Sequence, residues 1–219
     1  MSESSRVRRM VEVAGQRLSR VRVAAEHIFH RHNVSALLRS ADAFGVADVH
    51  LVGDRGFQPS QGPASGAARW LRLHRHREPA DAIAAIRDAG YRLWVADLSD
   101  APVPPHEVPV DAPICLWFGA ELMGVCEAAR VAADGVVTLP MYGMTQSLNL
   151  AAAASSALYV VTHAARAQHG AEALLPPAEA RALVDRWIDR VDREAERDRL
   201  REAALAAWAE RLRLTGDPP

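Results

Sequence analysis

The chain has 219 residues, enough to bury one substantial hydrophobic core without requiring a second full domain. Its formal net charge is −1, and this near-neutral balance argues against an unselective nucleic-acid-binding protein. The basic residues, all of them arginine, are nevertheless concentrated in two stretches, residues 6–22 and 69–77. We therefore expect basic surface to be local.

The sequence lacks the signals of a secreted, metal-binding or membrane protein. Cys115 and Cys126 alone indicate neither a disulfide framework nor a metal site, so we expect no metal and a reducing compartment. The arginine-rich N-terminus is not followed by an apolar signal region, and no stretch of roughly 18 apolar residues occurs. These features predict a soluble, cytoplasmic protein.

The first half of the chain alternates between helical and strand patterns. Residues 5–25 place apolar side chains at three- and four-residue steps, which predicts an amphipathic helix with exposed arginines. The ranges that follow predict helices over 34–44 and after Pro79, and strands at 48–52, near 69–73 and at 91–97. The proline-rich residues 101–113 are expected to form neither a helix nor a central strand.

The second half continues the alternation, with strands predicted at 114–118 and 135–139 and helices at 124–132 and 147–167. Beyond Pro176 an interrupted apolar stripe predicts one long or two shorter helices. The expected fold is α/β, a mostly parallel sheet with helices on both faces and helical extensions at both ends. The expected domains are a basic helix (1–26), an α/β domain (27–170) and a helical extension (171–219).

Two glycine-containing segments, FGAELMG (118–124) and LPMYGMTQSLN (139–149), follow predicted strands. Ligands of open α/β sheets bind outside the carboxyl ends of the strands, so we expect both segments to line one crevice. Glycines there permit tight turns and close approach of the main chain to a ligand. Each glycine taken alone equally indicates an ordinary turn.

A third segment, HNVSALLRSADAFG (32–45), carries Asn33 and Arg39 on a predicted helix. Asn33 and Ser147 each stand where an N-cap residue is expected, at the start of a predicted helix. Arg39 lies among apolar residues, so we expect it near the buried stripe with an acidic partner, for which Glu121 is the obvious candidate. These polar residues fit either helix caps and an ion pair or a catalytic site.

In order and spacing, the three segments resemble the signature motifs of the SpoU-type 2'-O-ribose RNA methyltransferases. The third motif is most similar to the tRNA guanosine-18 ribose methyltransferases of the TrmH group, and the similarity extends from about residue 6 to residue 170. The resemblance implies a C-terminal trefoil knot, S-adenosylmethionine as methyl donor, a homodimer, and tRNA or rRNA as partner, with no membrane.

The resemblance also implies roles for individual residues. Catalytic or positioning roles fall on Asn33, Arg39, Glu121, Ser147 and Asn149. Contacts to the methyl donor fall on Ala96, Leu98, Gly119, Leu139, Met141, Leu148 and Asn149, in a pocket bounded by residues 96–98, 118–124 and 139–150. Arg39 would either take part in deprotonating the ribose hydroxyl or stabilise the alkoxide and hold a phosphate.

Contacts to RNA phosphates are expected from the two basic stretches and from Arg39, through Arg8, Arg9, Arg20, Arg39, Arg72 and Arg75. The expected activity is 2'-O-methylation of a ribose in RNA, with guanosine 18 of the tRNA D-loop as the favoured target. The alternatives are a ribosomal RNA or wobble-position nucleotide, or a catalytically silent RNA-binding protein of the same fold. An ordinary Rossmann-type nucleotide binder is disfavoured because no G-x-G-x-x-G turn opens an alternating unit.

Overall fold

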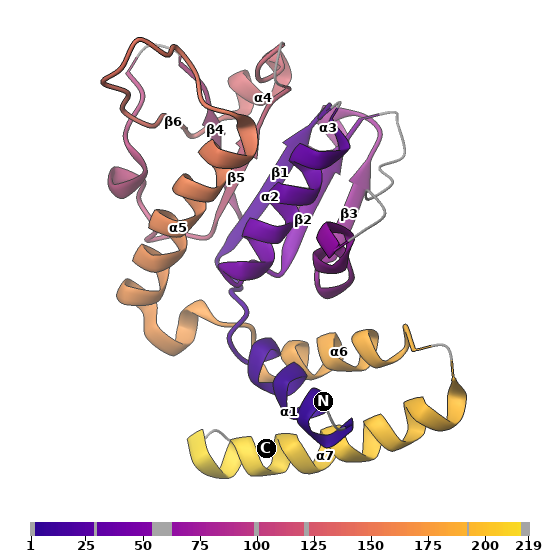
Figure 1. The fold of residues 1–219 in the computed structure, drawn as a ribbon. Helices are drawn as coiled ribbons and strands as arrows, with labels where there is room; N and C mark the ends of the chain where they lie inside the picture. The colour runs from indigo at the N-terminus through magenta and orange to yellow at the C-terminus, as the bar shows by residue number, and fades with distance from the viewer. Residues whose placement is uncertain are drawn as a thin grey trace. The chain divides into compact units, whose positions relative to one another are not determined.

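The computed structural model describes residues 3–28, 30–53, 63–98, 101–120, 123–191 and 193–215 (Figure 1). The chain divides into two compact units. One unit comprises residues 18–173, and the other combines the two ends of the chain, residues 1–17 and 174–219. Each unit has its own core.

Residues 18–173 form a six-stranded sheet in the order β3-β2-β1-β5-β4-β6. All of its strand pairs are parallel, so the carboxyl ends of the strands meet at one edge. This confirms the predicted α/β fold with a parallel sheet. The strands are β1 (Val21–Glu26), β2 (Asp48–Val52), β3 (Arg72–His76), β4 (Arg92–Ala96), β5 (Ile114–Phe118) and β6 (Gly135–Val137).

Helices pack on the sheet and fill the connections between its strands. The α-helices of this unit are α2 (Arg31–Ala43), α3 (Pro79–Asp88), α4 (Glu127–Ala132) and α5 (Leu150–His169). Short 3₁₀ helices occupy Pro63–Trp70 (η1), Pro105–Glu107 (η2) and Gly170–Ala173 (η3). The proline-rich segment thus contains only η2 and isolated pairing, as expected from its composition.

The two faces of the sheet bury different helices. Leu93 and Trp117 belong to one core cluster with Ile86 of α3 and Ala129 of α4. Because successive strand residues point to opposite faces, Phe118 faces the other side. There α2 and α5 pack against each other in front of the sheet (Figure 1). A core on each face explains why the strands read as continuous apolar runs.

The terminal unit consists of α1 (Glu3–Ala14), α6 (Pro177–Ile188) and α7 (Glu194–Thr215), each in contact with the other two. The C-terminal stripe is therefore two helices, one of the two arrangements the sequence allowed. Their buried faces carry Val7, Met10, Val11, Ala14, Leu183, Val184, Trp187, Ile188, Leu200, Ala204 and Trp208. The unit therefore has an apolar core, which is the main source of its stability.

The predicted helix over residues 5–25 is wrong in extent. The helix ends at Ala14, and Val21–Glu26 forms the central strand β1. A domain boundary after residue 26 would separate this strand from the sheet to which it belongs. A central parallel strand is buried on both faces and shows no alternation, so its apolar residues also fitted a helical spacing.

The strand predicted near 69–73 begins later than expected. Residues Pro63–Trp70 form η1, and β3 runs from Arg72 to His76. The other predicted helices and strands of residues 34–167 are confirmed to within a few residues at their ends. No helix in the described ranges is long and apolar enough to cross a membrane.

Candidate active site

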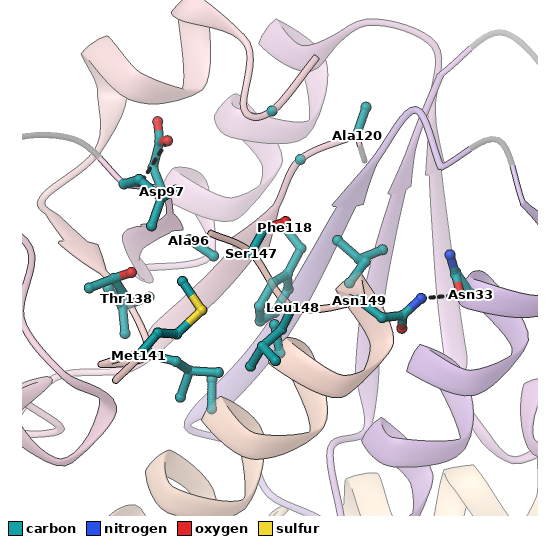
Figure 2. A pocket seen from close by; sticks show the side chains of 18 of the residues that line it. Asn33, Ala96, Asp97, Phe118, Ala120, Thr138, Met141, Ser147, Leu148 and Asn149 are labelled. Atoms are coloured by element: carbon teal, nitrogen blue, oxygen red, sulfur yellow. Dashed lines mark hydrogen bonds between the residues drawn. The ribbon is translucent and has the colours of Figure 1, made fainter. Parts of the chain in front are cut away.

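A pocket of about 570 Å³ lies at the carboxyl edge of the sheet, beyond the ends of β4, β5 and β6 (Figure 2). Its volume is within the range of small-molecule sites, roughly 300–1,000 Å³. It is lined by all the residues expected to contact a methyl donor: Ala96, Leu98, Gly119, Leu139, Met141, Leu148 and Asn149. The structure therefore brings these residues together, while their role as donor contacts stays a prediction.

The turn after β5 forms one wall of the pocket. The main-chain N–H of Ala120 donates to the carbonyl of Gly124 at 2.9 Å, and that of Gly124 donates to the carbonyl of Ala120 at 2.8 Å. A Cβ atom on Gly119 would lie 2.2 Å from the Gly124 carbonyl carbon and oxygen. Gly124 itself has a φ of +68°, which favours glycine. Both glycines of the FGAELMG motif are thus required by the backbone.

Asp97 supplies the one carboxylate among the described residues that line the pocket. Its Oδ1 accepts the main-chain N–H of Leu98 at 2.8 Å, and its Oδ2 pairs with Nε of Arg130 at 2.7 Å. Figure 2 shows Asp97 and Asn33 on opposite sides of the pocket. The carboxylate can accept hydrogen bonds from ligand hydroxyls, and Arg130 offsets part of its charge.

Asn149 and Asn33 join two helices at the other side of the pocket. The Nδ2 of Asn149 donates to Oδ1 of Asn33 at 3.1 Å, and Oδ1 of Asn149 accepts the N–H groups of Ala151 and Ala152. Asn149 is therefore the N-cap of α5, and the expectation that Ser147 caps this helix is wrong. Ser147 is exposed and lines the pocket.

Asn33 is not a helix cap either. His30 occupies the N-cap position of α2, and Asn33 lies inside its first turn with its side chain buried. The cap interpretation fails because α2 begins at Arg31, earlier than the apolar pattern indicated. Because the Asn33 side chain does not cap α2, its amide can bind Asn149 and line the pocket.

Arg39 does not lie where the sequence predicted it. Its side chain is exposed, it is absent from the described lining of the pocket, and it has no ion-pair partner among the described residues. Six residues separate it from Asn33, so the two side chains leave α2 on different sides. The proposed partner Glu121 lies outside the described residues. Within one chain, therefore, Arg39 is not part of the described lining of the pocket.

The arginines expected to bind RNA differ in how firmly the protein holds them. In the terminal unit, Arg8 pairs with Glu210 at 3.7 Å and Arg9 with Glu12 at 2.9 Å. Both pairs are exposed, and such pairs contribute little free energy, about 0–1 kcal/mol. These arginines can therefore exchange their carboxylate partners for phosphate at small cost.

In the sheet unit, Arg72 is held by an ion pair within the protein. It makes two hydrogen bonds, at 2.9 and 2.7 Å, with the buried carboxylate of Asp48. Arg20 donates to the carbonyl of Asp111 at 2.6 Å, whereas Arg75 is exposed on β3. Of the predicted RNA contacts in this unit, Arg39 and Arg75 have the most accessible side chains.

Two polar residues of the pocket lie outside the ranges predicted from the sequence. Thr138 lines the pocket because β6 ends at Val137, one residue before it. His30 lines it from the start of α2. Position just beyond a strand's carboxyl end was the signal that could have identified Thr138. In the described parts of the chain, no group of three or more histidine, cysteine or acidic side chains is arranged to hold a metal ion.

The chain is similar in sequence to known RNA methylases. A profile of the SpoU rRNA methylase family matches residues 20–159. The tRNA (guanosine(18)-2'-O)-methyltransferase of Escherichia coli K12 is 34% identical over 188 residues, covering 82% of this chain and 80% of the relative. The enzyme of the same name from Thermus thermophilus is 35% identical over 156 residues, covering 71% and 80%.

Solved structures show the same architecture. The TrmH/SpoU tRNA modifying enzyme of Aquifex aeolicus superimposes with a TM-score of 0.79 at 27% identity, covering 88% of this chain and all of that one. The SpoU methyltransferase AviRb of Streptomyces viridochromogenes, in complex with AdoMet, gives a TM-score of 0.59 at 28% identity. That match covers 68% of this chain and 61% of AviRb.

Proposed function

Because the chain belongs to the SpoU rRNA methylase family, we propose that it transfers a methyl group from S-adenosylmethionine to the 2'-hydroxyl of a ribose in RNA. The observation that carries the proposal is the convergence of three sequence segments, from the ends of β4 and β5 and from the start of α5, on one pocket. A silent RNA-binding protein would not need this pocket, and its retention argues for catalysis.

The favoured substrate is tRNA, with guanosine 18 of the D-loop as the target. The support is the name of the Escherichia coli and Thermus thermophilus relatives, each covered over 80% of its length. A ribosomal RNA or wobble-position ribose is the second candidate, because a donor pocket does not determine which ribose enters. We place the reaction in the cytoplasm, where such RNA is made.

The pocket fits the methyl donor in its chemistry. Leu139, Met141 and Leu148 supply apolar surface for the adenine ring, and the main chain around Gly119 offers hydrogen-bonding groups to its edge. Asp97 suits the ribose hydroxyls of the donor and favours its positive charge. We assign these residues to donor binding, together with Ala96, Leu98 and Asn149.

Bound S-adenosylmethionine supplies an activated methyl group on a sulfonium. The chain's own residues must hold the RNA ribose and ease loss of the proton from its hydroxyl, a very weak acid. Asn33, Ser147 and Asn149 present uncharged polar groups at the pocket, and we assign them to orienting the ribose. Orientation of the reacting groups lowers the barrier by several kcal/mol.

Arg39 and Glu121 complete the proposed machinery. A guanidinium stays protonated at neutral pH, so an ordinary base role for Arg39 is unfavourable. We assign Arg39 to the phosphate beside the target ribose and to the developing alkoxide, which its planar fork is suited to hold. Glu121 is retained as a positioning residue on the family motif alone.

We further propose that the segment between β6 and α5 takes part in a trefoil knot. Chain crossings demand small side chains, because backbones must approach closely. Ala151, Ala154 and Ala157 line the buried side of α5 with relative exposures of 9% or less. Tracing the crossings in an experimentally determined structure tests this proposal, and an unthreaded path for residues 139–149 would refute it.

A homodimer is proposed through part of the surface that the sequence indicated, because Ala152 and Ser156 of the 151–157 segment are exposed. Ala151, Ala154 and Ala157, and the tryptophans of the C-terminal helices Trp187 and Trp208, are buried within the chain. They are therefore not available to a second copy. The sheet unit instead exposes Tyr159 on α5, whose ring lies 5.8 Å from that of Phe44.

The exposed aromatic surface at Tyr159 can be tested directly. Tyr159→Arg is expected to yield monomers in light scattering, because a charged side chain would be buried without a partner at the interface. Val131→Arg is the matched control, since Val131 is also exposed but lies on α4. A wild-type monomer at assay concentration would contradict the dimer.

RNA binding through phosphate contacts is proposed for Arg8, Arg9, Arg20, Arg39 and Arg75. Arg72, also expected from the sequence, is left out because Asp48 holds its guanidinium. Replacing Arg8, Arg9 and Arg20 together by alanine should weaken tRNA binding. It should also reduce the slope of log affinity against log salt by roughly 0.7 to 0.9 for each phosphate that the variant no longer neutralises. Donor affinity should not change. An unchanged salt slope would locate the RNA surface elsewhere.

The activity itself is tested in two steps. Calorimetry should show that the protein binds S-adenosylmethionine, and mass mapping of transcripts exposed to protein and donor should locate a methylated ribose. Methylation in a tRNA D-loop supports the favoured substrate, and methylation only in ribosomal RNA or at the wobble position supports the second. A folded protein that binds the donor but modifies no RNA would leave the silent RNA-binding alternative.

A further inference from the structure

Glu26 is a buried carboxylate that the reaction as described does not use. It is the last residue of β1, at the same edge of the sheet as the pocket, and its exposure is 3%. Its Oε2 accepts hydrogen bonds from the indole Nε1 of Trp117 at 2.9 Å and from the main-chain N–H of Cys126 at 3.2 Å. Burying a carboxylate is costly unless such bonds are made.

The two groups that Glu26 binds flank the turn that forms one wall of the pocket. Trp117 is the penultimate residue of β5, and Cys126 is the N-cap residue of α4. Between them, Gly119 and Gly124 line the pocket. One oxygen atom thus accepts hydrogen bonds from both sides of the turn.

We propose that Glu26 is a positioning residue that sets the shape of the donor pocket. By fixing the distance between the Trp117 ring and the Cys126 amide, it holds the paired main chain of Ala120 and Gly124 in place. Glu26 is not among the described residues that line the pocket, so it acts on the donor through this turn. The identity of the ligand rests on the proposed function, whereas the linkage itself does not.

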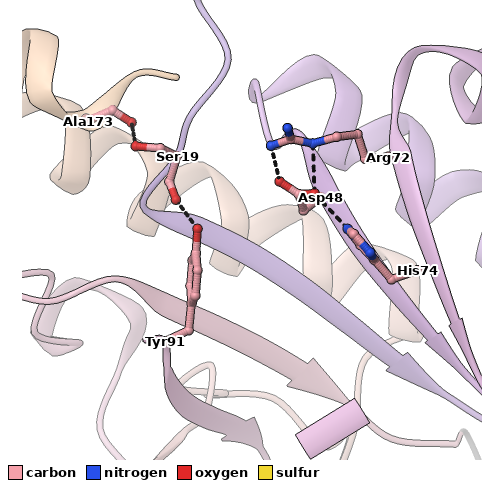
Figure 3. Close-up of polar contacts among 6 residues, drawn as sticks. All are labelled: Ser19, Asp48, Arg72, His74, Tyr91 and Ala173. Atoms are coloured by element: carbon pink, nitrogen blue, oxygen red, sulfur yellow. Dashed lines mark hydrogen bonds and ion pairs between the residues drawn. The ribbon is translucent and has the colours of Figure 1, made fainter. Parts of the chain in front are cut away.

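A matched control is available in the neighbouring strand. Asp48 is also a carboxylate with 3% exposure, on β2, which pairs directly with β1. Its two carboxylate oxygens accept hydrogen bonds from the guanidinium of Arg72, and its Oδ1 lies 2.7 Å from Nε2 of His74 (Figure 3). Asp48 is the first residue of β2, so it lies at the amino edge of the sheet, away from the pocket.

Two variants of Glu26 separate the position of the acceptor from its charge. Glu26→Gln keeps an oxygen at the same reach and removes the charge. Glu26→Asp keeps the charge and shortens the side chain by one methylene, so one oxygen can no longer serve both donors. We expect calorimetry to give a Kd for S-adenosylmethionine within about threefold of wild type for Gln and at least about tenfold higher for Asp.

The control Asp48→Asn should lower the melting temperature and leave donor affinity unchanged, because it weakens a buried ion pair distant from the pocket. Direct action of the Glu26 charge on the donor would give the reverse pattern, with Asp tolerated and Gln defective. That pattern, or wild-type affinity in the Asp variant, would overturn the proposal.

Hydrogen exchange provides a readout that needs no ligand. In the wild-type protein the amides of Ala120, Gly124 and Cys126 should be protected, and Glu26→Gln should retain this protection. Trp117→Phe, which keeps an aromatic ring and removes the indole N–H, should leave the Cys126 amide protected but raise the Kd for the donor.

A Cys126 amide that exchanges freely in the wild-type protein would refute the hydrogen bond between Glu26 and this amide. This test does not depend on whether the Glu26→Asp variant folds. Failure of the wild-type protein to bind S-adenosylmethionine, with these amides protected, would instead refute the proposed function and leave the linkage standing.

Discussion

Asn149 donates a hydrogen bond from Nδ2 to Oδ1 of Asn33, a residue 116 positions earlier in the chain, at 3.1 Å. The same side chain caps α5 through its Oδ1. The cap fixes the orientation of the amide, because only Nδ2 is then directed toward α2. One side chain therefore fixes the start of α5 and links it to the first motif.

These two functions of Asn149 can be separated by substitution. Asn149→Ser keeps an N-cap oxygen but is too short to reach Asn33, and Asn149→Ala removes both contacts. We expect Asn149→Ala to be less stable than Asn149→Ser by about 1 kcal/mol, the usual value of an N-cap, in denaturant unfolding.

Methyl transfer should fall to a similar degree in Asn149→Ser and in Asn33→Ala, because each breaks the same hydrogen bond. Combining the two should add little to either. Fully additive losses in the double variant would show that the two residues act independently.

The close packing at Gly119 gives a second prediction. A Cβ there would meet the main chain of Gly124 at 2.2 Å, which cannot be relieved by rotating a side chain. Gly119→Ala is therefore expected to displace the turn after β5 and to raise the Kd for S-adenosylmethionine by at least about tenfold in calorimetry.

Gly143 is the matched control for this substitution. It belongs to the third motif, yet an added Cβ would meet no atom within 4 Å. Gly143→Ala should bind the donor as the wild type does. Equal affinities for the two alanine variants would mean that the turn adapts and that the pocket does not depend on its shape.

The sequence predicted the pocket better than it predicted the functional geometry around it. Position at strand ends was enough to predict that the segments 118–124 and 139–149 line one crevice, because parallel strands place their carboxyl ends at one edge, whereas residues 96–98 came from the family resemblance. Helix caps were predicted less well. The sequence patterns near Asn33 and Ser147 predicted the first residue of each helix only to within a few residues.

Two other features could not be read from local patterns. β1 was taken for part of a helix because its burial on both faces depends on β2 and β5, which are distant in sequence. The charge of Arg39 indicated a buried partner, but the side chain is exposed because it leaves α2 away from the sheet. In both cases tertiary packing decided the outcome.

The exposure of Arg39 makes its substitution a clean test of function. Arg39→Ala should abolish methyl transfer, leave donor affinity nearly intact and change stability by less than about 0.5 kcal/mol, as for other surface sites. Arg39→Lys should not restore activity, because lysine lacks the planar fork that holds a phosphate through two bonds. Wild-type activity in the alanine variant would remove Arg39 from the mechanism.

Mixing experiments show whether Arg39 serves the pocket of a second copy. Arg39 and Asn33 leave α2 on different sides, so an inactive Arg39→Ala chain and an inactive Asn33→Ala chain could form one complete site in a mixed dimer. We expect partial recovery of methyl transfer when the two are unfolded and refolded together. No recovery despite mixed dimers would assign Arg39 to its own chain.

The final prediction concerns the stacked histidines of β2 and β3. His50 lies between His74 and His76, with ring centroids 4.7 and 5.2 Å away. Burial, together with the charges of His74, Arg22 and His76, lowers the pKa of His50 to about 3. In the unfolded chain the pKa is about 6.5, so between these values the unfolded state binds more protons than the folded state.

Stability should therefore fall as the pH drops below about 6.5. For a single group with these pKa values, the free energy of unfolding decreases by about 2 kcal/mol between neutral pH and about pH 5. The lowered pKa of His76 acts in the same direction. Asp48 adds nothing in this window. Burial raises its pKa, but hydrogen bonds from His74 and Arg72 bring it to about 2, so it affects stability only at lower pH.

His50→Phe keeps a ring in the stack and removes the titrating group, so its stability should depend less steeply on pH over this range. Denaturant unfolding of both proteins between about pH 7.5 and pH 5 measures the two slopes. Identical slopes would show that His50 takes up protons in the folded protein as it does in the unfolded chain, contrary to its burial between two other imidazoles.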